Sequence, residues 1–122
     1  MLEALGLTKW YGGFRAVTDV SFTLAGGEIL GYVGPNGSGK TSTVNMVTGL
    51  ILPTAGEVRF DGTRIDADLV AFRRHVGCVP EEPHLYPYLS GREHLELVAG
   101  LRGMDDRVAA RRIDALLDIL DL

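Results

Sequence analysis

One stretch of the sequence combines residue types and spacings that bind phosphate. Residues 34–41 fit the pattern G-x-x-x-x-G-K-[ST] at every fixed position. The stretch consists of Gly34, Pro35, Asn36, Gly37, Ser38, Gly39, Lys40 and Thr41. A loop that wraps a phosphate turns several backbone N–H groups inward, and glycine reaches the required angles without a Cβ clash. We therefore expect Gly34, Gly37 and Gly39 to give this loop its conformational freedom.

The residues that close the loop suit a polyphosphate and its metal ion. A helix that begins near Gly39 would point its free amides and its positive dipole end at the anion. Lys40 would reach the outer phosphates, Thr41 would offer its hydroxyl to Mg²⁺, and Ser42 or Thr43 would bond an inner phosphate. The alternative is a glycine-rich turn between a strand and a helix. An apolar run before the loop and a helix expected after it favour phosphate binding.

The first half of the chain is predicted to place strands before this loop and a helix after it. Residues 2–7 and 17–24 are predicted strands, the second with alternating apolar and polar side chains. Residues 28–33 form a short run that could be buried on both faces, as in a parallel sheet. Residues 41–48 should be helical, since Gly49 and Pro53 fit a helix end followed by a break.

A hairpin and a short helix should follow. Asp61-Gly62 separates two strand-like runs, 57–60 and 63–65, and predicts a type I′ turn. Residues 69–74 predict a short helix, and residues 76–79 predict a short strand that Pro80 stops.

The last third of the chain is predicted to be a loop and two helices. Residues 80–89 hold three prolines and should form a loop. Ser90 and Glu93 have the spacing of a capping box at the start of a helix over residues 90–101. Residues 107–120 carry apolar side chains on one helical face. The order of elements along the whole chain is typical of an α/β fold.

Composition limits the class of protein. At 122 residues the chain has room for about one domain. Its net charge of -4 argues against nucleic acid as a partner. No stretch approaches the roughly 20 apolar residues of a membrane span, and the N-terminus does not match a signal peptide. The single cysteine, Cys78, allows no disulfide framework and no cysteine metal site, and a reducing cytosol is the expected compartment.

Several motifs together resemble the nucleotide-binding domain of ATP-binding cassette (ABC) transporters. They are similar to the family's adenine-stacking loop (residues 9–12), its phosphate loop (34–43), the stretch after the loop helix (52–62), the strand and switch loop (76–81) and the entry to the helical subdomain (85–87 and 90–95). The resemblance runs from Leu2 to Leu122. It implies an α/β fold with a P-loop NTPase core and an antiparallel β subdomain over residues 1–80. Residues 81–122 would hold the switch loop and the start of an α-helical subdomain, truncated before the signature motif.

The resemblance also assigns ligands, namely ATP and Mg²⁺. It implies that Tyr11 stacks on adenine. Glu81 stands where the family's glutamine meets Mg²⁺ and the attacking water, which makes it a catalytic candidate and, with Thr41, a metal ligand. A glutamate adds negative charge beside the triphosphate, and the alternative is a solvated loop acid like Glu82. With an acid at this position, the segment 80–89 resembles the corresponding segment of cassettes that serve ABC-2-type exporters.

The family hydrolyses ATP in a head-to-tail dimer and drives transport through membrane subunits. The resemblance therefore implies a transmembrane permease subunit and a second nucleotide-binding domain as partners. It also implies a cytoplasmic protein held peripherally on the inner face of the cell membrane. The family's signature, its Asp-Glu strand and its switch histidine do not occur in the sequence. We interpret the chain as the N-terminal part of a longer cassette protein or as a truncated chain, which alone should bind Mg·ATP weakly and hydrolyse little or none.

Three segments partly resemble the family's Asp-Glu strand or its signature without matching either. Residues 76–82 are an apolar run with acids, but Pro80 intervenes and no aspartate is present. Residues 116–121 have apolar spacing that is helical, which places Asp118 on a solvated helix face. Leu89-Ser90-Gly91 is similar to the start of the signature, but a helix cap accounts for these residues.

Other residues leave alternatives open. His75, His84 and His94 show no metal spacing and are interpreted as surface or core residues, and Cys78 as a buried strand residue. A soluble P-loop kinase-like enzyme is one alternative. It would need a lid with arginines and a pocket for the substrate that accepts the phosphate, and the candidate arginine pairs are residues 73–74 and 111–112. A non-catalytic nucleotide-binding module is the second alternative.

Overall fold

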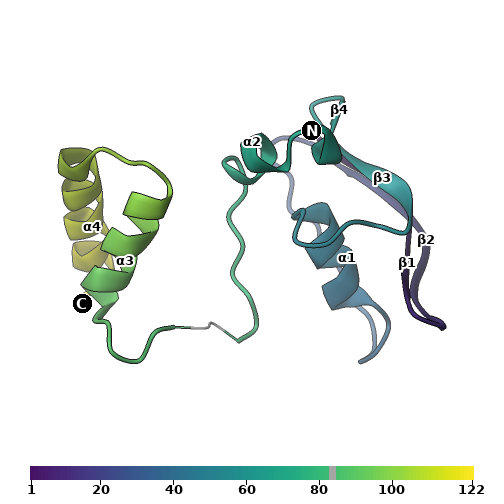
Figure 1. Ribbon diagram of the computed structural model, residues 1–122, viewed down its shortest axis with the longest axis horizontal. Helices are drawn as coiled ribbons and strands as arrows, with labels where there is room; N and C mark the ends of the chain where they lie inside the picture. Colours follow the sequence, from purple (N-terminus) through teal and green to yellow (C-terminus); the bar gives the residue numbers. More distant parts are fainter. Residues whose placement is uncertain (83–84) are drawn as a thin grey trace. The chain divides into compact units, whose positions relative to one another are not determined.

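The computed structural model describes residues 1–82 and 85–122, which divide into two compact units, Met1–Cys78 and Val79–Leu122 (Figure 1). The predicted loop over residues 80–89 forms neither helix nor strand in its described part. Its residues Pro83 and His84, and with them the assignment of His84 to surface or core, lie outside the described residues.

The first unit is built on an antiparallel sheet. Its strands are β1 (Leu2–Tyr11), β2 (Phe14–Leu24), β3 (Ala55–Phe60) and β4 (Thr63–Arg64), in the spatial order β2-β1-β3-β4. The first two strands are longer than predicted, because their ladder continues to the pair Tyr11–Phe14 on either side of the Gly12-Gly13 turn. Tyr11 is therefore the last residue of β1, is paired with Phe14 and lies directly before the β1–β2 turn.

The predicted hairpin at Asp61-Gly62 is confirmed. Both residues have positive φ, 48° and 78°, as a type I′ turn requires. Strand β4 ends at Arg64, and the 3₁₀ turn η1 (Ile65–Ala67) follows. The side chain of Ile65 is part of the buried core. The short helix α2 (Leu69–Arg73) follows, with Asp68 accepting a hydrogen bond from the Ala71 amide.

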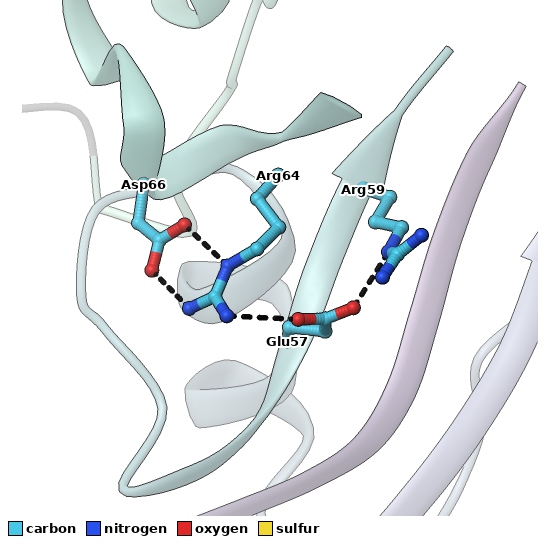
Figure 2. A network of polar contacts seen from close by, with 4 residues as sticks. All are labelled: Glu57, Arg59, Arg64 and Asp66. Atoms are coloured by element: carbon cyan, nitrogen blue, oxygen red, sulfur yellow. Dashed lines mark hydrogen bonds and ion pairs between the residues drawn. The ribbon is translucent and has the colours of Figure 1, made fainter. Parts of the chain in front are cut away.

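A chain of ion pairs braces this hairpin (Figure 2). Arg64 donates through Nε and Nη2 to both carboxylate oxygens of Asp66, at 3.0 and 2.6 Å, and its Nη1 lies 3.0 Å from Glu57 Oε2. Arg59 Nε donates to the other Glu57 oxygen at 2.6 Å. Hydrogen bonds from Arg64 lower the pKa of Asp66, and that carboxylate in turn raises the pKa of Arg64. Because Arg64 and Asp66 are solvated, these contacts fix geometry more than they add stability.

Helix α1 (Lys40–Val47) packs against the sheet and closes the core of the first unit. Met46, on its inner face, is fully buried. The buried core consists of Ala4, Leu7, Val17, Met46, Val58, Ile65 and Phe72. Phe60 and Phe72 meet edge to face, with ring centroids 5.6 Å apart. The helix that follows the phosphate loop is thus held by residues from β1, β2 and β3.

Two predicted strands are wrong. Residues 28–33 and 76–79 form no strand, and Ile29, Val33 and Val79 are 99%, 91% and 95% exposed. A strand inside a parallel sheet needs hydrogen-bonded neighbouring strands at its edges and helices that cover its two faces. Within the described residues, the sheet offers these segments no such neighbour. Val76 is partly buried against the core, but most other apolar residues of these two runs are exposed. Cys78, predicted to be a buried strand residue, is exposed.

The second unit contains a pair of helices, α3 (Gly91–Leu101) and α4 (Asp106–Leu120). The capping box is confirmed: Ser90 Oγ accepts from the Glu93 amide, and the Glu93 carboxylate accepts from the Ser90 amide at 2.7 Å. These bonds explain Ser90 as a helix cap. Residues 116–120 lie in α4 with Asp118 exposed, as their helical spacing predicts.

Candidate functional site

The phosphate loop lies directly before α1, and its backbone uses left-handed angles at two glycines. Gly37 has φ 79° and Gly39 has φ 85°. Gly34, by contrast, is not in this region, so the expected freedom is used only by the other two. At Gly39 a Cβ atom would overlap the carbonyl oxygen of Ala16 on β2. Strand β2 therefore requires glycine at the last loop position.

The first turn of α1 is open to an anion. Within the described residues, no side chain caps this helix, and its first turn carries no acidic residue. The N-termini of α2, α3 and α4 are each capped by a side chain, from Asp68, Ser90 and Asp105. Because the first amides of a helix have no intrahelical partner, the N-terminus of α1 presents free donors to the loop.

Lys40, the first residue of α1, folds back over the loop. Its Nζ atom donates to the carbonyl oxygens of Gly34 and Pro35, both at 2.7 Å. The ammonium is thereby held inside the loop by two oxygens.

The three hydroxyl residues after Lys40 lie in different surroundings. Thr41 is exposed, as a metal or phosphate contact requires. Ser42 is half-buried, and its Oγ lies 3.4 Å from the Tyr11 hydroxyl. Thr43 is 1% exposed, and its hydroxyl donates to the Gly39 carbonyl at 3.0 Å.

Tyr11 is brought to this helix from the end of β1. Its side chain is 48% exposed, and its hydroxyl is the group that meets Ser42. The Lys9 ammonium lies 5.4 Å from the centroid of its ring. The fold thus unites a predicted base-stacking residue with the phosphate loop across 31 residues of sequence.

Two residues of the site carried no predicted role. The Tyr32 hydroxyl lies 3.3 Å from Thr43 Oγ1 and helps to hold that side chain. Nothing in the sequence indicated this contact, since Tyr32 was assigned to a buried strand. Lys9 could have been found from its spacing, because residues i and i+2 of a strand share one face.

Glu81 is exposed and lies in the second unit, in a segment without helix or strand. Its expected approach to the metal and to the phosphate loop stays a prediction. The exposed acid Glu82 follows it directly.

The two described histidines bond backbone groups. His75 Nδ1 lies 3.0 Å from the Ala71 carbonyl. His94 Nε2 accepts the Tyr86 N–H at 2.8 Å, so its Nδ1 carries the proton toward the Ser90 carbonyl. Across residues 1–82 and 85–122, no helix combines the length and the apolar composition that crossing a membrane demands.

The chain is similar to bacterial ABC transporter proteins over its whole length. It is 35% identical over 122 residues to the uncharacterized ABC transporter ATP-binding protein YhcH of Bacillus subtilis, and covers 39% of that protein. It is 36% identical over 124 residues to the choline transport ATP-binding protein OpuBA of the same bacterium, and covers 32% of it. The bacitracin transport ATP-binding protein BcrA of Bacillus licheniformis is 34% identical, and 39% of it is covered. The chain therefore spans about two fifths or less of these relatives.

Solved structures have the same fold. The dimeric cassette MJ0796 superposes on all of this chain with a TM-score of 0.85 at 29% identity, and 58% of that cassette is covered. An ATP-binding subunit of an ABC transporter superposes on 96% of this chain with a TM-score of 0.82 at 33% identity, with 49% of it covered. The fold is that of the P-loop NTPase cassettes. Since the family model of the ABC transporter also matches residues 17–122, this chain belongs to the ABC transporter family.

Proposed function

We propose that this chain binds the triphosphate of Mg·ATP, as part of the ATP-binding subunit of an ABC transporter. The observation that supports this most directly is the uncapped N-terminus of α1 behind the G-x-x-x-x-G-K-[ST] loop. Free helix amides, a helix dipole and the Lys40 ammonium all favour an anion at one place.

The loop and the helix that follows it then divide the contacts to the nucleotide. Backbone N–H groups within residues 34–39 surround the phosphates, except at Pro35, which has none. Lys40 exchanges its two carbonyl partners, Gly34 and Pro35, for outer phosphate oxygens. Ser42 bonds an inner phosphate, a task that the buried Thr43 hydroxyl supports by fixing the Gly39 carbonyl.

The metal and the base are bound at the two ends of the nucleotide. Thr41 offers an exposed hydroxyl oxygen, and Glu81 a carboxylate, which are the hard oxygen donors that suit Mg²⁺. The bound metal would neutralise charge that develops on the phosphates. Tyr11 stacks on adenine, and Glu81 orients the attacking water. These assignments rest on the family pattern and on the exposure of the side chains.

The whole protein is proposed to hydrolyse ATP and to drive transport across a membrane. Residues 1–80 supply the nucleotide-binding core and residues 81–122 the switch loop and the start of the helical subdomain. A second nucleotide-binding domain and a transmembrane permease subunit are the proposed partners, with the protein held on the inner face of the membrane. Support for the dimer comes from the similar cassette MJ0796, which is dimeric, and which in another structure is bound to ADP and Pi.

Titration calorimetry of the 122-residue chain with Mg·ATP tests the binding site. Lys40→Met removes charge-assisted hydrogen bonds and should weaken binding about 10- to 100-fold. Arg74→Met, an exposed site outside the loop, makes the same change in net charge and should leave the affinity unchanged. Absence of binding in the natural chain, or equal affinity in the Lys40→Met variant, would contradict the proposal.

The transport role is tested on the full-length gene product. Affinity purification from membranes should recover a polytopic membrane subunit, both for the natural sequence and for Lys40→Met. ATP hydrolysis by the recovered complex should be lost only in Lys40→Met. Recovery of the protein alone, with no membrane subunit, would count against a transporter.

A further inference from the structure

A lysine outside the phosphate loop holds the side chain proposed to stack on the base. We propose that Lys9 is a positioning residue that orients the Tyr11 ring for a nucleobase. This inference rests on the proposed nucleotide binding and adds a residue to that site.

The first support is the position of the Lys9 ammonium. It lies over the Tyr11 ring, 5.4 Å from the centroid, within the range of a cation–π contact. Lys9 and Tyr11 are two residues apart on β1 and therefore share one face of that strand. The contact is thus built into the alternation of the strand.

The second support is the anchor of that ammonium. Lys9 Nζ donates to the Leu52 carbonyl oxygen at 2.7 Å, across 43 residues of sequence. Leu52 lies between α1 and β3. The lysine is therefore held at its ammonium group as well as at its backbone.

The third support lies at the far end of the ring. The Tyr11 hydroxyl is 3.4 Å from Ser42 Oγ, in the first turns of α1. Three attachments then define the ring: the β1 backbone, the ammonium over one face and the hydroxyl near the phosphate-loop helix. Tyr11 is 48% exposed, and the base is proposed to stack on the ring face opposite the ammonium.

Such an arrangement reduces the conformational entropy that the Tyr11 side chain loses when a base binds. A tyrosine free to rotate loses that freedom when a base stacks on it, whereas a ring already held loses little. Lys9 should therefore strengthen binding of a ligand that has a base, and should not affect one that has only phosphates.

The neighbouring pair provides a matched control. The Arg15 guanidinium lies 5.4 Å from the Trp10 ring, the same distance as in the Lys9–Tyr11 pair. Both pairs lie near the β1–β2 turn. Arg15→Met removes one positive charge and one cation–π contact without touching Tyr11.

The experiment measures Kd for Mg·ATP and for Mg·tripolyphosphate on the 122-residue chain and on three variants. Lys9→Met should weaken ATP about two- to fivefold, the effect of losing an exposed cation–π contact, and leave tripolyphosphate unchanged. Lys9→Arg keeps a cation over the ring and should restore ATP binding. Arg15→Met should change neither ligand. Both constants come from the same sample, so a loss of folded protein cancels in their ratio.

The outcomes separate this inference from the function it rests on. Equal weakening of both ligands in Lys9→Met would show a general effect of charge and overturn the positioning role, as would no change in either. If the natural chain binds tripolyphosphate and ATP equally, base stacking is absent and the inference fails while the phosphate site stands. If the natural chain binds neither, the proposed nucleotide binding itself fails.

Discussion

The backbone carbonyl of Ala16 in β2 lies directly against Gly39 at the N-terminus of α1. A Cβ atom at residue 39 would approach this oxygen more closely than the 3.0 Å that real Cβ atoms respect, and Val17 Cγ2 would also be too near. The last turn of the phosphate loop is therefore shaped by Ala16, a strand residue that precedes Gly39 by more than 20 residues. This contact connects the rigid sheet to the donors that would hold phosphate.

The first prediction follows from this contact. Gly39→Ala should destabilise the first unit by about 2–4 kcal/mol, because it adds left-handed strain to an overlap with fixed backbone. Gly37→Ala is the matched control: Gly37 also has positive φ, but a Cβ atom there meets nothing within 4 Å. It should cost only about 1–2 kcal/mol. Urea denaturation of both variants provides the comparison, and equal costs would show that Ala16 does not constrain the loop.

Sequence patterns predicted the local elements well where the signal itself was local. The Asp61-Gly62 turn and the Ser90–Glu93 capping box need only neighbouring residues, and both are confirmed. The helix predicted after the phosphate loop is also present, and Gly39 is its N-cap residue, without a side-chain cap. These features depend on backbone angles and short-range hydrogen bonds, which a few residues determine.

Features that depend on distant partners were not predictable. The runs 28–33 and 76–79 are apolar enough for buried strands, yet hydrophobicity alone does not supply the neighbouring strands that would pair with them. In the site, the contact of Tyr32 with Thr43 and the anchor of Lys9 on Leu52 are set by tertiary packing. The residue types of the site were thus visible in the sequence, but the groups that support them were not.

The second prediction concerns Arg73, which bonds the far end of the phosphate-loop helix. Its Nη2 donates to the carbonyl oxygen of the buried Gly49, just beyond the end of α1. Arg73→Met removes this donor and a cation near a helix C-terminus, and should lower the free energy of unfolding of the first unit by about 1–2 kcal/mol. Arg74→Met, one residue on and exposed, should cost under about 0.5 kcal/mol. Thermal or urea unfolding distinguishes the two, and similar losses would mean that the Gly49 bond adds no stability.

The third prediction tests the cap of α3. Ser90→Ala removes the hydroxyl that accepts from the Glu93 amide, and should lower the free energy of opening of α3 by about 1 kcal/mol. Ser90→Thr keeps a hydroxyl and should stay close to the natural chain. Amide hydrogen exchange over residues 92–101 measures this opening directly. Unchanged protection in Ser90→Ala would show that the cap does not limit the stability of the helix.

The fourth prediction is a pH dependence at the same cap. Hydrogen bonds from the Ser90 amide and hydroxyl lower the pKa of Glu93 in the folded chain below its ordinary value. The stabilisation that this ionised carboxylate adds is therefore complete above the unfolded-state pKa, about 4.3, and is lost as pH falls through the lower folded value. The difference in α3 opening between the natural chain and Glu93→Gln should shrink as pH falls below that range, because the protonated Glu93 then resembles the neutral glutamine. Carbon-13 NMR of the carboxyl groups locates the titration, and a Glu93 pKa at or above the ordinary value would contradict the prediction.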